Sequence, residues 1–356
     1  MMLGNAAGMA VTMMDLSDAD QRQAIDDYVM GHAAGTPFHR PAWMRAVEQA
    51  TGNRALMPVA VGPSGRIAGL LPLHHVKSRL FGQALVSTAF AVDGGILADD
   101  HRAASGLAAA AQGLARERGG LPVELRGGPA PGEGWQMGDS EHVGFTRPIG
   151  ADDAAELAAI PRKHRAELRK ALANSALSWD VGRGPQYLRD HYHVYARSVR
   201  NLGTPVFPRA LFRAVLDHFG ADADIVIVRE GARPVSAVLT LYHHGRVMPF
   251  WGGGIADARR LRSNELMYYR LMGHGRDRGM TLFDFGRSKS GSGQAAWKKS
   301  FGFTPQPLVY HGWSPDGAVR DIDPHSARYQ RRIALWKKLP LHVANLIGPM
   351  ISRGLG

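Results

Sequence analysis

Apolar positions follow two different spacings along the chain, and each spacing predicts one kind of element. Runs of apolar and β-branched residues broken by glycine-containing turns predict hairpins. Each such segment is followed by residues whose apolar positions recur at helical spacing, and then by a further short apolar run. The order strand, strand, helix, strand is therefore expected twice. The two copies of the pattern cover 58–76, 102–118 and 122–127, and then 224–253, 264–278 and 281–286.

The second half of each pattern is also repeated in its letters. Residues 116–125, RERGGLPVEL, align without a gap with residues 276–285, RDRGMTLFDF. Gly119 and Gly279 stand where the end of a helix needs a left-handed residue. The repeat indicates a duplicated α/β unit, whose element order is typical of acyltransferases of the GNAT type. The predicted fold class is α/β with two tandem GNAT-like domains, each a mixed sheet flanked by helices.

This repeat gives the expected domain organisation. We predict an N-terminal GNAT-like domain at 1–150, a C-terminal one at 151–320 that holds the catalytic motifs, and a basic amphipathic tail at 321–356. The C-terminal domain begins with a helical insert at 151–173, interrupted at Pro161. Two further helices are expected at 185–202 and 208–219. The first fourteen residues, which have no Lys or Arg before their apolar run, are interpreted as a frayed or misassigned start.

Charge is distributed unevenly between the two halves of the chain. The 356 residues carry 43 Lys plus Arg and 31 Asp plus Glu, a net charge of +12. Up to Ile160 the chain holds 12 basic and 17 acidic residues, whereas the rest holds 31 basic and 14 acidic ones. Such asymmetry favours an anionic partner for the C-terminal part, and a solvated basic face without a partner is the alternative.

Composition excludes several kinds of chemistry. The absence of cysteine excludes disulfides, Cys-ligated zinc, iron–sulfur clusters and thiol nucleophiles. Two His-His pairs, at 74–75 and 243–244, lack a third ligand at suitable spacing, so no metal is expected. No window of about 18 apolar residues occurs, which argues against a transmembrane helix. A cytoplasmic protein is predicted, with peripheral contact at the inner membrane surface left open.

The densest cluster of candidate chemistry lies between Trp251 and Phe303. Three arginines, Arg259, Arg260 and Arg262, precede Ser263 and Asn264, and a Ser or Asn helix cap would place free backbone N–H groups beside the guanidinium groups. That arrangement predicts an anion site. An ordinary basic loop before a capped helix would have the same sequence.

A glycine- and serine-rich segment follows the last apolar run of the repeat. Residues 286–293, GRSKSGSG, are predicted to form a flexible loop that contains Arg287, Ser288 and Lys289. The segment lacks the ending of a P-loop, so no nucleotide triphosphate site is predicted. Asp284, in an otherwise apolar strand, is expected to pair with a cation such as Arg287 or to face the site as a base.

Two adjacent lysines follow in WKKSFGF. Lys298 and Lys299 are expected to point in different directions, so that one lines the site and the other is solvated. A lysine in this place is suited to stabilise an oxyanion or hold a phosphate.

The order WGGG, SNELMYYRLM, RGMTLFDFGRSKSGSG and WKKSFGF resembles the FemAB-like family, whose members contain two GNAT-like domains. The run DFGRSK followed by a Lys pair and an aromatic-Gly-Phe is most similar to the branch associated with exosortase/PEP-CTERM exopolysaccharide systems; other relatives are grouped as BioF2-like acetyltransferases. The resemblance implies that Trp297 and Lys298 match the catalytic end of the family's site. It also implies cationic positions at Lys163, Arg165 and Arg169.

The function expected from these residues and this resemblance is N-acyl or aminoacyl transfer to an amine on a cell-envelope or exopolysaccharide precursor. Acyl-CoA or aminoacyl-tRNA would be the donor substrate, with no bound cofactor. The expected catalytic residues are Lys298, Asp284 and Arg287. The expected binding residues are Arg259, Arg260, Arg262, Asn264, Lys163, Arg165, Arg169, Ser288, Lys289 and Trp251.

Two other interpretations remain open from the sequence. A non-catalytic basic module that binds RNA or an anionic glycan would share the charge but would form no product. The tail at 329–356 mixes Arg and Lys with Trp, Leu and Ile, which is compatible with peripheral membrane contact and equally with packing on the protein.

Overall fold

The computed structural model describes residues 2–6, 9–138, 141–317 and 327–355 and divides the chain into two compact units. Unit 1 contains Met1–Ser140, Leu308–Pro324 and Met350–Gly356, and unit 2 contains Glu141–Pro307 and His325–Pro349. The division falls near 140 rather than 150, because the strand that begins at His142 pairs within unit 2. The strand at Tyr310–Trp313 comes after most of unit 2 in the chain but pairs with Val123–Arg126 of unit 1.

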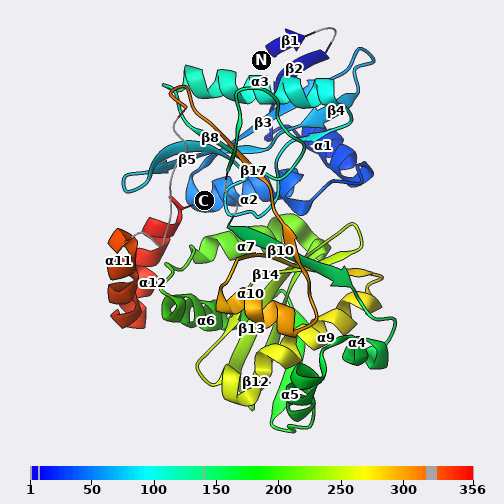
Figure 1. Cartoon of the computed structure of the whole chain (residues 1–356), viewed down its shortest axis with the longest axis vertical. Coiled ribbons are helices and arrows are strands. Elements are labelled where there is room, and N and C mark those ends of the chain that lie inside the picture. The colour runs from blue at the N-terminus through cyan, green and yellow to red at the C-terminus, as the bar shows by residue number, and fades with distance from the viewer. Residues whose placement is uncertain (1, 7–8, 139–140, 318–326, 356) are drawn as a thin grey trace. The chain divides into compact units, whose positions relative to one another are not determined.

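Unit 1 is built on a mixed sheet whose main path runs β1-β2-β3-β5-β6-β8-β17-β9, with β4 and β7 attached beside β3 (Figure 1). Helix α3 packs along β1 to β4, while α1 and α2 pack near β3. The strands are β1 (Met2–Ala6), β2 (Met9–Met14), β3 (Arg54–Val61), β4 (Ile67–Leu70), β5 (Leu73–Ser78), β6 (Gly82–Ser87), β7 (Leu97–Ala98), β8 (Val123–Arg126), β9 (Gln136–Gly138) and β17 (Tyr310–Trp313). The helices are α1 (Ala19–Gly31), η1 (Pro37–His39), α2 (Pro41–Thr51) and α3 (His101–Glu117).

The start of the chain differs from the sequence-based interpretation. The described residues among the first fourteen form β1 and β2, and β2 pairs antiparallel with β3. Met9 and Val11 are buried against the core of unit 1. The expectation of a frayed start was wrong, because the partner strand lies some forty residues farther along the chain and leaves no local signal.

The carboxyl ends of two parallel strands in unit 1 are covered by the unit's own backbone. Strands β6 and β8 pair in parallel up to Ser87 and Leu125. The segment 88–95 then crosses these ends: the Arg126 guanidinium donates to the carbonyls of Thr88 and Ala91 at 3.1 and 3.0 Å, and the Gly94 N–H donates to Arg126 O at 3.0 Å. No side chain fits at Gly95, because a Cβ there would lie 2.0 Å from Gly127 O.

This close approach gives a stability prediction. Gly95→Ala is expected to destabilise unit 1 by about 1–3 kcal/mol, since the clash is with backbone that cannot move aside. Gly113→Ala is the matched control, because Gly113 lies in α3 with open space around its Cβ position, and a gain of about 0.5–1 kcal/mol is expected there. Chemical denaturation measures both. Equal stability of the two variants would contradict the packing described for the segment 88–95.

Unit 2 is built on a second mixed sheet in the order β11-β12-β13-β14-β15-β10-β16 (Figure 1). Its strands are β10 (His142–Pro148), β11 (Leu177–Gly182), β12 (Ala223–Glu230), β13 (Arg233–His243), β14 (Arg246–Gly254), β15 (Leu282–Lys289) and β16 (Pro305–Pro307). Its helices are α4 (Asp153–Ala159), α5 (Arg162–Leu172), α6 (Pro185–Leu202), α7 (Arg209–Phe219), η2 (Gly220–Asp222), α8 (Ala258–Leu261), α9 (Ser263–Asp277), α10 (Gly293–Ser300), α11 (Ala327–Lys338) and α12 (Leu341–Ser352), the last continuing into residues assigned to unit 1.

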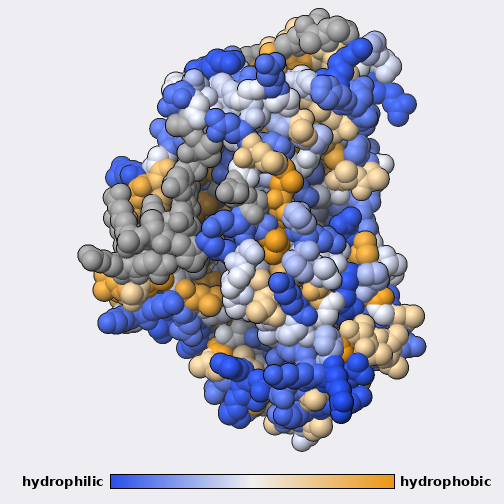
Figure 2. All heavy atoms as spheres, viewed as in Figure 1, coloured by the Kyte–Doolittle hydropathy of each residue, from blue (hydrophilic) through white to orange (hydrophobic). Residues whose placement is uncertain are grey.

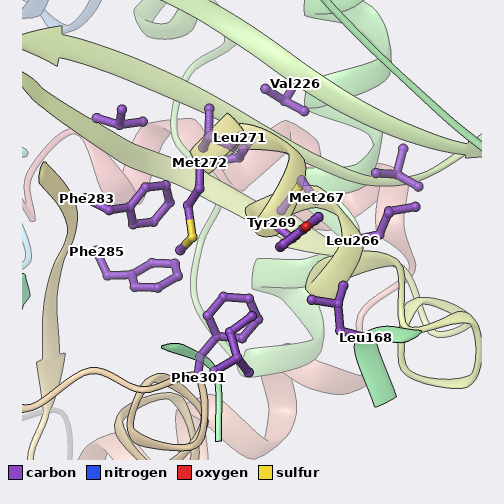
Figure 3. Close-up of a cluster of buried hydrophobic side chains, with 14 of the residues drawn as sticks. Leu168, Val226, Leu266, Met267, Tyr269, Leu271, Met272, Phe283, Phe285 and Phe301 are labelled. Carbon is purple, nitrogen blue, oxygen red and sulfur yellow. The ribbon is translucent and has the colours of Figure 1, made fainter. Parts of the chain in front are cut away.

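The core of unit 2 joins the sheet to helices α5, α8, α9 and α10. Figure 3 shows Leu266, Met267, Leu271 and Met272 of α9 between the strands and the ring of Phe301. The aromatic side chains of β15 alternate into this core, because residues two apart in a strand face the same side. Phe283 and Phe285 lie 4.8 Å apart between ring centroids, with their rings nearly perpendicular. The Phe285 ring also packs edge-on against Trp297, with 5.8 Å between ring centroids, and this contact joins β15 to α10.

Strands β14 and β15 part after a short parallel pairing. They pair only at Arg246–Leu282 and Val247–Phe283. We call the remainder, Met248–Gly254 of β14 and Asp284–Lys289 of β15, the strand fork. On its other side β15 pairs antiparallel with β10, and this ladder is interrupted between Gly144 and Thr146. Backbone groups of β15 are thus left without a ladder partner on part of its length.

Several predicted helices have the expected bounds. The helical insert breaks at Pro161 into α4 and α5, and α6 begins at Pro185 and ends at Leu202 as predicted. Gly119 and Gly279 have φ values of +86° and +77°, which confirms their place after α3 and α9. The segment 224–253 holds three strands, β12 to β14, rather than a hairpin alone.

The tail forms two helices separated near Pro340. Arg331 and Arg332 lie in a part of α11 whose side chains are outside the described ones. Among the residues that the structure describes, no helix is both long enough and apolar enough to cross a membrane.

Candidate functional site

Lys298 of α10 reaches the strand fork. Its Nζ donates to the carbonyl oxygens of Phe285 at 2.8 Å and Arg287 at 3.1 Å, both on β15 beyond its pairing with β14. The same ammonium lies 5.1 Å from the centre of the Phe145 ring, in β10. Helix α10 holds it there because Ser292 caps the helix, accepting from the Ala295 N–H at 3.2 Å. Lys299 is exposed, so the two lysines do point in different directions.

Burial makes the ionisation of Lys298 and Asp284 sensitive to their surroundings. Desolvation lowers the pKa of Lys298 to about 8, and the nearby Asp284 carboxylate offsets only part of that effect. Desolvation also raises the pKa of Asp284, although the Gly286 N–H donates to it at 2.8 Å and Arg246 lies 4.0 Å away. A lysine and a carboxyl group, both with shifted pKa values, therefore interact electrostatically in this part of unit 2.

Ser288 and Lys289 follow on the same strand. Ser288 is 4 % exposed, and its hydroxyl has no hydrogen-bond partner among the described residues. Lys289 forms an ion pair with Glu141. The predicted flexible loop at 286–293 was wrong in its first half, because β15 continues to Lys289 through pairing with β10. Only 290–292 connect β15 to α10.

The predicted helix cap before SNELM was also wrong. Arg262, with a φ of +56°, occupies the cap position after the short helix α8, and Ser263 is the first residue of α9. The Ser263 hydroxyl is buried and lies 2.6 Å from the Ser236 hydroxyl, which also donates to Asn264 Oδ1 at 2.7 Å. These polar side chains tie α9 to β13 and do not cap the helix.

Two of the three predicted anion-binding arginines already contact carboxylates. Arg262 Nε lies 2.7 Å from Glu167 of α5, and Arg260 lies 3.4 Å from Glu230. Arg259 is exposed, and the described residues show no ion pair for it. Of this cluster, Arg259 is the residue most available to an anionic ligand.

Helix α5 presents a basic surface, but its three predicted cations are not equivalent. Lys163 and Arg169 are exposed. Arg165 instead donates to the carbonyl oxygens of Ala158 and Ile160 at 2.9 and 3.0 Å, where it holds the end of α4. Figure 2 shows mainly hydrophilic residues over the end of the molecule where Figure 1 draws α5.

Trp251 lies in the hydrophobic interior of unit 2. It is 5 % exposed and its ring packs edge-on against Phe212 of α7, with 5.0 Å between ring centroids. Its carbonyl oxygen lies 2.6 Å from His191 Nε2 of α6. These contacts anchor β14 to α6 and α7.

Part of the chain matches a known protein family, and the whole chain has the fold of several solved structures. Residues 161–299 match the family model described as an acetyltransferase (GNAT) domain. The crystal structure of FemX superposes with a TM-score of 0.67 at 15% identity, covering 92% of this chain and 100% of that one. A tandem GNAT protein from the clavulanic acid biosynthesis pathway gives 0.55 at 14% identity, covering 88% and 100%. The chain has the tandem GNAT fold.

A further structure shares this tandem GNAT fold. The C-terminal domain of a protein assigned as a lysylphosphatidylglycerol synthetase from Agrobacterium fabrum gives a TM-score of 0.55 at 13% identity, covering 89% of this chain and 96% of that one. No sequence among the curated proteins matches the chain significantly. Identities this low establish the fold, and the activity has to be argued from the site itself.

Phe145 beside Lys298 and Arg246 beside Asp284 were not predicted from the sequence, and neither was a histidine that packs on α10. His164 of α5 packs edge-on against Trp297 and Phe301, with ring centroids 5.6 and 5.1 Å away, and its Nε2 lies 4.0 Å from Glu265 of α9. Burial lowers the pKa of His164, which opposes its protonation. The sequence signal that could have indicated His164 was its place in PRKHR, where it is the one aromatic ring among cationic side chains.

Proposed function

We propose that unit 2 transfers an acyl or aminoacyl group from an activated donor to an amine on a cell-envelope or exopolysaccharide precursor. The observation that carries this proposal is the Lys298 ammonium at the strand fork, bonded to two carbonyl oxygens of β15. A cation held in a largely dry place stabilises negative charge on a carbonyl oxygen more strongly than it would in water.

The strand fork of unit 2 is where we place the donor. A donor with an amide-containing arm could bond to the backbone groups that β14 and β15 leave unpaired there. The corresponding ends of β6 and β8 in unit 1 are covered by 88–95 and by Arg126. Among the described residues of unit 1, the ends of these two strands therefore leave no backbone groups open to a donor, which favours a reaction centre in unit 2.

The reaction needs positioning more than a covalent intermediate. The acceptor amine attacks the donor carbonyl carbon, a C–N bond forms, and the bond to the donor sulfur or oxygen breaks. Lys298 stabilises the oxyanion that forms on the carbonyl oxygen, and the Ser288 hydroxyl donates a hydrogen bond to the acyl-donor substrate. The proton of the attacking amine passes to the leaving group. Asp284 and Arg287 position Lys298, the former by charge and the latter through its carbonyl oxygen.

Both donor classes remain part of the proposal. The name lysylphosphatidylglycerol synthetase, borne by one protein that shares the fold, favours an aminoacyl donor, and the match of residues 161–299 to an acetyltransferase (GNAT) domain favours an acyl-CoA donor. We assign Arg259 to the donor phosphates, with Arg260 and Arg262 assisting once their carboxylate partners are displaced. Lys163 and Arg169 would hold an anionic acceptor, and the exopolysaccharide role rests on the resemblance of DFGRSK.

Native mass spectrometry with acetyl-CoA and, separately, with aminoacyl-tRNA distinguishes the donors. We expect one of them to be retained, and Arg259→Ala to weaken its binding roughly tenfold, because one charge-assisted bond to phosphate is lost. Arg66→Ala, at an exposed arginine of unit 1, is the control and should bind as the wild type does. Retention of uncharged RNA with no product from either donor would favour the non-catalytic alternative.

A further inference from the structure

We propose that the two-helix tail, α11 and α12, binds the surface of an anionic lipid bilayer and so holds the enzyme at a membrane. The surface is that of α11 and α12, and its binding to lipid does not depend on the acyl-transfer chemistry. It rests on the exposed apolar side chains of the tail, on its charge and on the way α11 is fixed to unit 2.

The tail exposes large apolar side chains more densely than the rest of the described chain. Leu335 is 67 % exposed, Leu346 74 % and Met350 64 %. Leu346 and Met350 are four residues apart in α12, so they lie on one helix face, which His342 extends by one turn.

The exposed apolar side chains belong to helices that are packed on unit 2. The Arg200 guanidinium of α6 donates to the carbonyl of Lys337 at 2.9 Å, and Ile333 packs so closely on Gly203 that a Cβ there would lie 2.5 Å away. Ala344 is buried, and Val206 closely approaches Gly348. The tail is thus attached to unit 2 by one face while Leu335 and Leu346 stay in contact with solvent. Leu202, which precedes Gly203, is a further exposed leucine at 53 %.

Charge specifies the kind of surface that would cover this face. From His325 to the end the sequence contains six Lys or Arg and no Asp or Glu. Lys337 and Lys338 are exposed at the end of α11, next to the exposed leucines. A basic helix pair with leucine and methionine on its free face matches the chemistry of an interfacial helix on anionic lipid. An apolar protein partner would not need the excess of positive charge.

The length of the helices agrees with lying on the membrane rather than crossing it. Each has twelve residues, about 18 Å at the usual rise of a helix, well short of the roughly 30 Å hydrocarbon layer. Attachment would therefore be peripheral and reversible. An acceptor that is itself membrane-linked would then reach the enzyme along the surface.

Vesicle co-sedimentation of the full-length protein tests the proposal. The probes are vesicles of phosphatidylethanolamine with phosphatidylglycerol, and vesicles of phosphatidylcholine alone, at about 0.1 M salt. We expect binding to the anionic vesicles only. The double variant Leu335→Glu/Leu346→Glu should lose at least tenfold in partitioning, and Lys337→Gln or Lys338→Gln about fivefold each. Leu80→Glu and Met137→Glu, equally exposed but in unit 1, are the matched controls and should bind normally.

Two results would overturn the proposal. One is wild-type protein that fails to bind the anionic vesicles, or a double variant that binds them as tightly as the controls do. The other is a wild-type dimer in sedimentation velocity that becomes a monomer only in the double variant, because the face would then belong to a second copy. The double variant changes exposed side chains only, so its melting temperature should equal that of the controls.

Discussion

Replacing Lys298 by methionine is expected to reduce the rate of acyl transfer roughly 100- to 1,000-fold, the usual cost of losing one preorganised oxyanion stabiliser. Methionine keeps an unbranched side chain against the Phe145 and Phe285 rings, so the fold should be retained. Lys299→Met, at the exposed neighbouring lysine, is the control and should retain nearly full activity. Single-turnover kinetics with the donor identified by mass spectrometry measures the difference.

The pH dependence separates a catalytic charge from a merely structural one. Burial lowers the pKa of Lys298 to about 8, so its ammonium form is lost as pH rises through that value. The acceptor amine becomes more nucleophilic over the same range, and a bell-shaped profile with an upper limb near pH 8 is expected. Lys298→Arg keeps the charge at all these pH values and should move that limb to higher pH. An unchanged upper limb in Lys298→Arg would remove Lys298 from the role proposed here.

Glu156→Ala is expected to lower the free energy of unfolding of unit 2 by about 3–5 kcal/mol, because it leaves a mostly buried guanidinium without its counter-charge. Glu156 of α4 is 1 % exposed and forms an ion pair with Arg147 of β10. It also accepts from the Gly150 N–H at 2.8 Å, while Arg147 lies over the Phe303 ring. This pair ties α4 to β10, the strand that pairs with β15.

Hydrogen exchange at the amides of β10 and β15 reports this loss within unit 2 alone. Glu117→Ala, whose side chain is 62 % exposed, is the control and should change stability by less than about 0.5 kcal/mol. Exchange in Glu156→Ala as slow as in the control would mean that the pair contributes nothing to the placement of β10.

Local signals in the sequence predicted much of the fold. The repeat placed α3 and α9 within a residue of their observed bounds, because amphipathic spacing and a following left-handed glycine act over one or two turns. The break at Pro161 and the start of α6 at Pro185 were predicted for the same reason.

Long-range pairing explains what the sequence could not predict. The glycines and serines of GRSKSGSG indicated a loop, yet β10, about 140 residues earlier, makes half of it a strand. Met9–Met14 became a strand through β3 for the same reason. The predicted cap before α9 was wrong because the side chains of Ser263 and Asn264 form hydrogen bonds with Ser236 of β13 rather than with their own helix.

The sequence predicted which residues belong to the candidate site better than it predicted the contacts that these residues make. The sequence indicated Lys298 and Asp284, and the structure places them near each other. It could not indicate that carboxylates contact Arg260 and Arg262, because those carboxylates come from β12 and α5. It also could not separate Arg165, which holds the end of α4, from the exposed Lys163.

The most direct test of the central claim is product formation by the purified chain. Acetyl-CoA or aminoacyl-tRNA is incubated with amine-bearing envelope and exopolysaccharide precursors, and the acceptor mass is measured with wild type and with Lys298→Met. Acyl transfer by unit 2 predicts an acceptor heavier by one acyl or aminoacyl group with one donor class, formed at a rate that falls at least 100-fold in the variant. Product formed equally by both proteins, or binding of RNA or glycan without product from any donor, would contradict it.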